Sequence, residues 1–220
     1  MTGEATGDAG LPLVERLLTI GGRQFRVWAV EDEEALLALS ETREPFPFGL
    51  LLWEGAVALA GRLADVSVAL EGRRVLELGC GVGLAGLIAA SRGALVTATD
   101  HDPLPLEVAR RNAMQNDVAG IDFVEADWDR WSDHERYDLI IGADVTYDRQ
   151  SHEAVLSILE RNLAPGGTAI LADPAREEQA TFVGRLRARG FSVVLEARTV
   201  EDLVRWGLSV DVTLLTIKGI

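Results

Sequence analysis

The sequence predicts an α/β fold with a doubly wound, mostly parallel seven-stranded sheet whose last strand is antiparallel. From Arg74 onward, short apolar segments typical of strands alternate with segments of helical periodicity. A glycine-rich turn joins the first of these strands to the helix that follows. Only a loop, Thr199 to Gly207, separates the last two strands, and it is too short for a helical crossover, so they must pair antiparallel. These features are Rossmann-like.

A smaller set of elements precedes the sheet. Residues 1–12 are small, polar or acidic for the most part, and we expect them to form a mobile tail. Two apolar segments, Leu17 to Ile20 and Gln24 to Val30, flank Gly21-Gly22 and predict a β-hairpin. A short acidic helix start or turn is expected over Glu31 to Leu39.

An amphipathic helix is expected from about Glu54 to Ala64, and it completes an N-terminal extension over residues 13–65. The main domain then occupies residues 66–220. Within it, strands are predicted near residues 74–78, 94–99, 121–125, 137–143, 167–172, 191–197 and 209–217, and helices near 83–92, 103–116, 150–163 and 175–189.

The segment V-L-E-L-G-C-G-V-G-L-A-G is the most informative part of the chain. A buried strand containing Glu77 runs into a turn with glycines at alternate positions, Gly79, Gly81 and Gly83, and then into a helix. Glycines let the backbone approach a ligand, and the free N–H groups of the new helix point toward it. Cys80 lies among these glycines, where a small residue is a better explanation than a nucleophile.

Two ligands use such a turn. The spacing G-x-G-x-x-G is also that of dinucleotide-binding proteins, in which the helix faces a pyrophosphate. A carboxylate at position 77 would repel a pyrophosphate but attract an ammonium group. S-adenosylmethionine carries an ammonium and a sulfonium and no phosphate, so Glu77 favours this methyl donor as the cofactor.

The next two strands end in residues suited to the rest of an adenosine. Asp100 lies 17 residues after Gly83, near the ~20-residue spacing at which a carboxylate meets a ribose. Asp102 is expected to cap the following helix, and His101 to be exposed or packed on the ligand edge. Asp127 and Trp128 offer an acceptor and an aromatic surface for adenine, although loop packing explains the tryptophan as well.

Composition limits the partners. The 220 residues contain 35 acidic and 21 basic side chains, and the net charge of −14 argues against nucleic acid. No apolar run is long enough to span a membrane, and the first residues lack the basic start of a secretory signal. The single cysteine favours the cytoplasm. We expect a monomer with no membrane partner.

Several ordered motifs carry a family resemblance. They are Leu52-Trp53, E-L-G-C-G-V-G-L from Glu77 to Leu84, Asp127-Trp128, and A-D-V-T-Y from Ala143 to Tyr147. With them, the chain resembles class I, seven-β-strand S-adenosylmethionine-dependent methyltransferases. It is most similar to the branch of protein lysine methyltransferases with an Asp-x-x-Tyr signature and to its bacterial relatives. The chain departs from the family pattern at Glu54, where the family often has proline. A further likeness is Asp173-Pro174-Ala175-Arg176, which resembles a D-P-x-R motif of bacterial relatives.

The resemblance implies roles for individual residues. Trp53 would close over the donor, Gly79 to Gly81 would line its amino-acid end, and Ala143 would contact it from the fourth strand. Asp100 would hold the ribose, while Asp127 and Trp128 would bracket the adenine.

Asp144 and Tyr147 carry the chemical hypothesis. Methyl transfer from a sulfonium needs no metal, but a lysine amine must lose its proton first. A carboxylate near the methyl would attract the ammonium, and the carboxylate or a water would relay the proton. Tyr147 would face the amine. As an alternative, Asp144 caps the helix near residue 150, although Asp148 is better placed to do so. Phe46 and Phe48 would wall a substrate pocket or be plain core residues.

Four functions remain open at this stage. The first is methylation of a lysine in a protein partner, and the second is methylation of a small amine beneath a lid formed by residues 17–50. The third is a donor-binding regulator without turnover. The fourth is a nicotinamide-dependent oxidoreductase.

Overall fold

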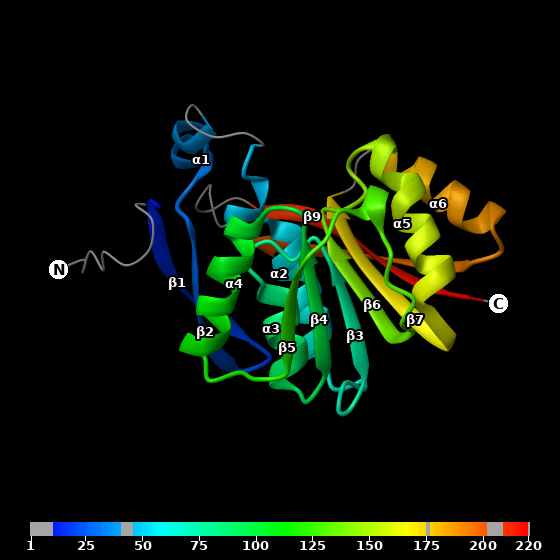
Figure 1. Cartoon of the computed structure of the whole chain (residues 1–220), viewed down its shortest axis with the longest axis horizontal. Coiled ribbons are helices and arrows are strands. Elements are labelled where there is room, and N and C mark those ends of the chain that lie inside the picture. Colours follow the sequence, from blue (N-terminus) through cyan, green and yellow to red (C-terminus); the bar gives the residue numbers. More distant parts are fainter. Residues whose placement is uncertain (1–10, 41–45, 175–176, 202–208, 220) are drawn as a thin grey trace.

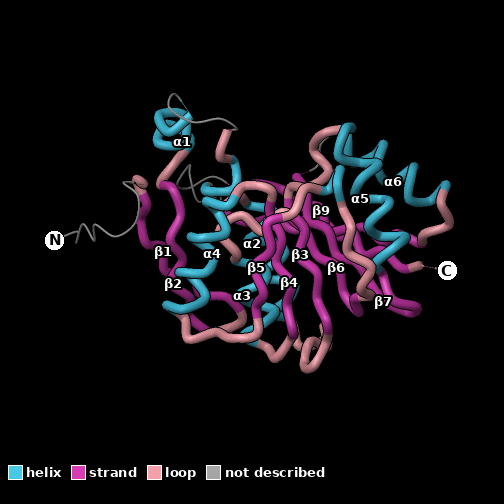
Figure 2. The backbone as a smooth tube through the Cα atoms, viewed as in Figure 1, coloured by secondary structure: helices cyan, strands magenta, loops and turns pink. Residues whose placement is uncertain are grey.

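The computed structural model describes residues 11–40, 46–174, 177–201 and 209–219. The expected mobile tail lies almost wholly outside this part of the chain. A seven-stranded sheet occupies the centre of the molecule, with helices on both faces (Figures 1 and 2).

The sheet has the strand order β5-β4-β3-β6-β7-β9-β8, in which β9 alone runs antiparallel to the other six strands. This confirms the predicted fold class and the antiparallel last strand. The strands are β3 (Arg74–Leu78), β4 (Leu95–Asp100), β5 (Ile121–Glu125), β6 (Tyr137–Ala143), β7 (Leu163–Pro174), β8 (Ser192–Glu201) and β9 (Ser209–Lys218).

Two strands extend beyond their predicted ends because partners are available. β7 begins at Leu163, which pairs with Tyr137 before the register shifts near the glycines at 166 and 167. β8 continues to Glu201, since Val200 and Glu201 pair with Val210 and Ser209. The loop between the last two strands is therefore shorter than the sequence suggested.

Because successive side chains of a strand point to opposite faces, the sheet contributes residues to two apolar layers, one on each face. Val75, Leu139 and Ile141 face one layer together with helices α2 (Glu54–Ala64), α3 (Leu84–Ser91) and α4 (Pro103–Gln115). Leu76 and Ile140 face the other layer with α5 (Arg149–Asn162) and α6 (Glu177–Ala188). The helices thus cover both faces, as a sheet buried on both sides requires.

The N-terminal elements lie beside α4 (Figures 1 and 2). Strands β1 (Leu13–Ile20) and β2 (Arg23–Val30) form the predicted hairpin. Gly21 and Gly22 both have positive φ, 58° and 78°, as its two-residue turn demands. Helix α1 (Glu33–Ser40) and the short 3₁₀ helix η1 (Phe48–Leu50) follow. β1 starts earlier than expected because β2 offers pairing partners as far as Val30.

Among the described residues, no helix is both long and apolar enough to cross a bilayer.

Candidate active site

The three glycines after β3 perform different tasks, although all have positive φ. At Gly81, a Cβ would lie 2.9 Å from the carbonyl oxygen of Gly49, so η1 packs directly on the glycine turn. At Gly83, a Cβ would lie 2.7 Å from the Cβ of Ala109, so the glycine lets helices α3 and α4 pack close together. At Gly79, a Cβ would lie 3.3 Å from the ring of Trp128.

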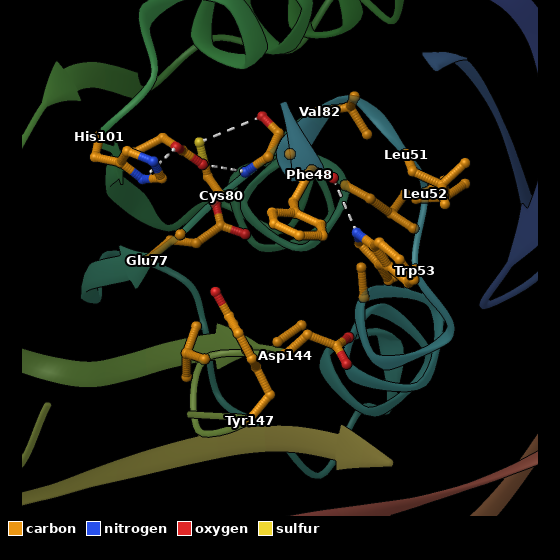
Figure 3. A pocket seen from close by; sticks show the side chains of 18 of the residues that line it. Phe48, Leu51, Leu52, Trp53, Glu77, Cys80, Val82, His101, Asp144 and Tyr147 are labelled. Carbon is orange, nitrogen blue, oxygen red and sulfur yellow. Dashed lines mark hydrogen bonds and ion pairs between the residues drawn. The ribbon is translucent and has the colours of Figure 1, made fainter. Parts of the chain in front are cut away.

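A cavity of about 230 Å³ lies at the carboxyl ends of β3, β4 and β6 (Figure 3). It brings together every predicted site residue except Gly83 and Asp127. The predicted residues in its wall are Trp53, Glu77, Gly79, Cys80, Gly81, Asp100, His101, Trp128, Ala143, Asp144 and Tyr147.

Glu77 is buried beneath the glycine turn, with 3% of its surface exposed. Its Oε1 accepts a hydrogen bond from the Gly86 N–H at 3.1 Å, whereas the buried Oε2 has no hydrogen-bond partner among the described residues. A Cβ on Gly86 would lie 2.3 Å from Oε2, which explains a glycine inside α3. Burial raises the pKa of Glu77 to about 8, and the nearby charge of Asp100 adds to this rise.

This arrangement fits the amino-acid end of S-adenosylmethionine. Glu77 lines the cavity and has one buried carboxyl oxygen without a donor among the described residues, and an ammonium group bound in the cavity would supply a donor to this carboxyl group. A cation bound there would stabilise the carboxylate and lower its pKa.

Asp100 is also nearly buried and supports the turn. Its Oδ2 accepts from the Gly81 N–H at 2.9 Å and its Oδ1 from the Asp102 N–H at 3.1 Å. Each carboxylate oxygen keeps a second lone pair, so a ribose hydroxyl can still bind. Burial raises the pKa of Asp100. Asp102 caps α4 through the Leu104 N–H, as predicted, and His101 is exposed at the cavity rim.

The two residues expected at adenine differ in position. Trp128 lines the cavity, whereas Asp127 lies outside its wall and caps the short 3₁₀ helix η2 (Trp128–Arg130) through the Asp129 N–H at 3.0 Å. Trp131 donates to Asn162 at 2.9 Å and packs in the apolar layer under α5, which is a structural role.

The N-terminal segment supplies one wall that the sequence only hinted at. Phe48 lines the cavity with half of its surface exposed, and its ring lies 4.4 Å from that of Phe46. The Trp53 indole donates to the Phe48 carbonyl at 3.0 Å and fixes this wall (Figure 3). Helix α2 begins at Glu54 as predicted, so the absence of proline there does not disturb it.

The thiol of Cys80 is not an activated nucleophile. It is buried, and burial together with the charge of Glu77 raises its pKa well above the ordinary value. Its Sγ lies 3.6 Å from the Gly81 carbonyl. The structure thus agrees with the interpretation of Cys80 as a small residue in a tight turn.

Asp144 and Tyr147 lie at the opposite side of the cavity, after β6. Asp144 has φ 54°, unusual for a residue other than glycine, and its N–H donates to the Ala172 carbonyl at 2.8 Å. Its carboxylate turns toward the first turn of α2, because Gly55 leaves space that a Cβ would fill 2.1 Å from Oδ2. The Tyr147 hydroxyl points into the cavity (Figure 3). Asp148 caps α5 through the Gln150 N–H, as predicted.

Two residues that the sequence analysis left without a role hold this turn in place. The buried Thr146 hydroxyl donates to Asp173 Oδ2 at 2.6 Å, so the end of β7 supports the loop after β6. The ring of His152, also buried, contacts the Thr146 carbonyl at 2.9 Å. The sequence did contain a signal for the partner of Thr146, since Asp173 is the first residue of the D-P-x-R motif. Arg176, the last residue of that motif, lies outside the described residues.

We predict that Glu77→Gln becomes more stabilising as the pH rises. Below about 4.5 the Glu77 carboxyl is protonated in both the folded and unfolded chain, but between 4.5 and about 8 only the folded chain keeps the proton. The free energy of unfolding of the wild type therefore falls through this window by roughly 1.4 kcal/mol per pH unit on account of this group, and glutamine removes that loss.

Urea denaturation at pH 5 and pH 8 measures this effect, with the exposed Glu107→Gln on α4 as the control. A difference between Glu77→Gln and wild type that stays the same at both pH values would show that Glu77 does not retain its proton.

Comparisons with known proteins agree with this geometry. Residues 31–189 match the family model described as lysine methyltransferase. The protein N-lysine methyltransferase METTL21A of Danio rerio is 36% identical over 166 residues, which cover 71% of this chain and 75% of that protein. The EEF1A lysine methyltransferase 3 of Mus musculus is 33% identical over 153 residues, covering 67% of this chain and 66% of that protein.

A solved structure shares the fold. The N-methyltransferase NodS of Bradyrhizobium japonicum, in complex with S-adenosyl-L-homocysteine, superposes with a TM-score of 0.60 over 74% of this chain and 85% of its own, at 21% identity. The family match and the two lysine methyltransferase relatives confirm the expected enzyme class and its methyl donor, and the dinucleotide alternative is set aside. Since the family model spans well over half of the sequence, the chain belongs to the lysine methyltransferase family of S-adenosylmethionine-dependent methyltransferases.

Proposed function

We propose that this methyltransferase modifies the ε-amine of a lysine in a protein partner. One observation carries the proposal: a single cavity is lined by residues of both kinds. Glu77 and Gly81 lie at the glycine turn of residues 79–83 (the donor turn), and Asp144 and Tyr147 lie after the end of β6. Donor and acceptor would therefore meet in one space. The names of the lysine methyltransferases that the chain resembles support the choice of acceptor.

In this proposal, the chain holds the donor at three points. Glu77 faces the ammonium, Asp100 accepts from the ribose, and Trp128 offers its ring to the adenine. When bound, S-adenosylmethionine supplies an electrophilic methyl group on a positively charged sulfur. Phe48 and Trp53 cover the amino-acid end and exclude water from it.

The acceptor amine arrives as an ammonium and must lose its proton before it attacks. Asp144 contributes a negative charge near the cavity. Its carboxylate lies beside the first turn of α2, where the positive end of the helix dipole attracts a negative charge. Because this carboxylate turns toward α2, we assign it the attraction of the ammonium, and we assign the acceptance of the proton to a water at the open rim. Tyr147 orients the amine through its hydroxyl.

The rim suits a long side chain presented by a larger molecule. Phe48 and Tyr147 both line the cavity and are 52% and 51% exposed, so no segment within the described part of the chain closes over these two rings. Such rings pack against the methylene chain of lysine and attract its ammonium. The net charge of −14 favours a basic acceptor segment. As part of this proposal, the protein acts in the cytoplasm as a monomer, and its two domains meet between residues 65 and 66.

A methylation assay on a whole lysate tests the acceptor class. Methyl-labelled S-adenosylmethionine and the purified protein are added to a lysate of source cells that lack this gene. We expect label in protein, and mass spectrometry should locate it on lysine. Label confined to small molecules would instead support the small-amine alternative. Absence of any label from a protein that binds S-adenosylhomocysteine would support a regulator without turnover.

Asp144→Asn separates chemistry from donor binding. We expect kcat to fall about 100-fold because the charge that attracts the ammonium is lost, while the Kd for S-adenosylhomocysteine stays within threefold. Tyr147→Phe, which keeps the ring, should lower kcat about tenfold.

The matched control is Asp148→Asn, four residues along the chain, since asparagine caps a helix as well as aspartate does. Its kcat should stay within threefold of wild type. An Asp144→Asn variant as active as this control would remove Asp144 from the mechanism.

A further inference from the structure

One asparagine on α4 and a second at its C-cap complete the outer edge of strand β2. Asn112 accepts from the Trp28 N–H at 2.8 Å and donates to the Trp28 carbonyl at 3.0 Å. Asn116 does the same for Arg26, at 2.9 and 2.7 Å. Each side-chain amide thus takes the place of a backbone amide in a neighbouring strand.

The spacing of the two elements makes this pairing possible. Four residues of α-helix advance about 6 Å and two residues of strand about 6.6 Å. Asn112 and Asn116 therefore stay in step with Trp28 and Arg26. The other edge of β2 pairs with β1, so the whole hairpin is attached to α4 through these residues.

Asn112 and Asn116 differ in the third bond that each side chain makes. The Asn112 Nδ2 also donates to the carbonyl oxygen of Val82 at 2.9 Å, whereas the Asn116 Nδ2 donates to the backbone carbonyl of Asn112 at 2.7 Å. Val82 lies between Gly81 and Gly83 in the donor turn and lines the cavity. Asn112 is 1% exposed, so water cannot readily replace this bond.

The donor turn is consequently held from two sides. Asp100 accepts from the Gly81 N–H, and Asn112 donates to the Val82 carbonyl, so the peptide groups flanking the bend have fixed orientations. Glycines on both sides of Val82 leave this segment with little conformational preference of its own. Its shape thus depends on these outside partners as well as on the bond within the turn from the Gly83 N–H to the Cys80 carbonyl at 2.8 Å.

We propose that Asn112 is a positioning residue that couples the β1–β2 hairpin to the donor turn. Trp28 fixes the amide of Asn112, and the amide fixes the Val82 carbonyl in the orientation that S-adenosylmethionine requires. The coupling is reciprocal: donor binding stabilises the contact between Asn112 and Trp28. This inference rests on donor binding by the turn and is independent of the acceptor.

Asn112→Ala and Asn116→Ala form the matched pair that tests it. Both variants lose two bonds to the hairpin, but only the first loses the bond to Val82. We expect Asn112→Ala to weaken S-adenosylhomocysteine binding at least tenfold by calorimetry and to raise the KM for the donor with kcat within twofold. Asn116→Ala should bind within threefold of wild type.

Two results would overturn the proposal: Asn112→Ala binding within threefold of wild type, or equal weakening by both variants. Failure of the wild type to bind S-adenosylhomocysteine would overturn the proposed function as well, and this outcome is distinct from the other two.

Hydrogen exchange in the wild type tests the same coupling should Asn112→Ala fail to fold. Saturation with S-adenosylhomocysteine should slow exchange of the Trp28 N–H at least fivefold. The Arg26 N–H, which bonds to Asn116, should change less than twofold. Equal changes at the two amides, or none at either, would contradict the proposal.

Discussion

The buried carboxyl group of Glu77 is the constraint on which the rest of the site depends. It lies under the turn between β3 and α3, where Oε1 accepts from the Gly86 N–H and the buried Oε2 has no hydrogen-bond partner among the described residues. Burying this group raises its pKa to about 8 and disfavours the folded chain at higher pH. A bound ammonium would offset this cost, which makes the site selective for a cationic amino acid moiety over a phosphate.

The remaining parts of the site are arranged by neighbouring elements that each contribute one support. Asp100 at the end of β4 holds Gly81, and α4 holds the Val82 carbonyl through Asn112. After β6, Asp173 at the end of β7 holds Thr146. Residues from parallel strands meet at one edge of the sheet, so a few hydrogen bonds between adjacent strand ends position the residues on both sides of the cavity.

The sequence was sufficient for the architecture and for the convergence of Glu77, Asp100 and Trp128 on one cavity. Alternating apolar segments specify strands and helices locally, and Glu77, Asp100 and Trp128 follow strand ends that must converge. The sequence could not reveal that Asp127 caps η2 outside the cavity, since a carboxylate after a strand suits either task. The sequence also could not predict the pairing of Asn112 with Trp28, because these two residues lie 84 positions apart in the chain. The direction of the Asp144 carboxylate depends on Gly55 in another helix.

Calorimetry of S-adenosylhomocysteine binding at pH 7, in two buffers of different ionisation enthalpy, tests the central claim most directly. With a pKa of about 8, Glu77 is mostly protonated before the ligand binds and must ionise to pair with the ammonium. We predict release of close to one proton on binding to the wild type and almost none on binding to Glu77→Gln. Binding by the wild type without proton release, or equal release by both proteins, would contradict the account.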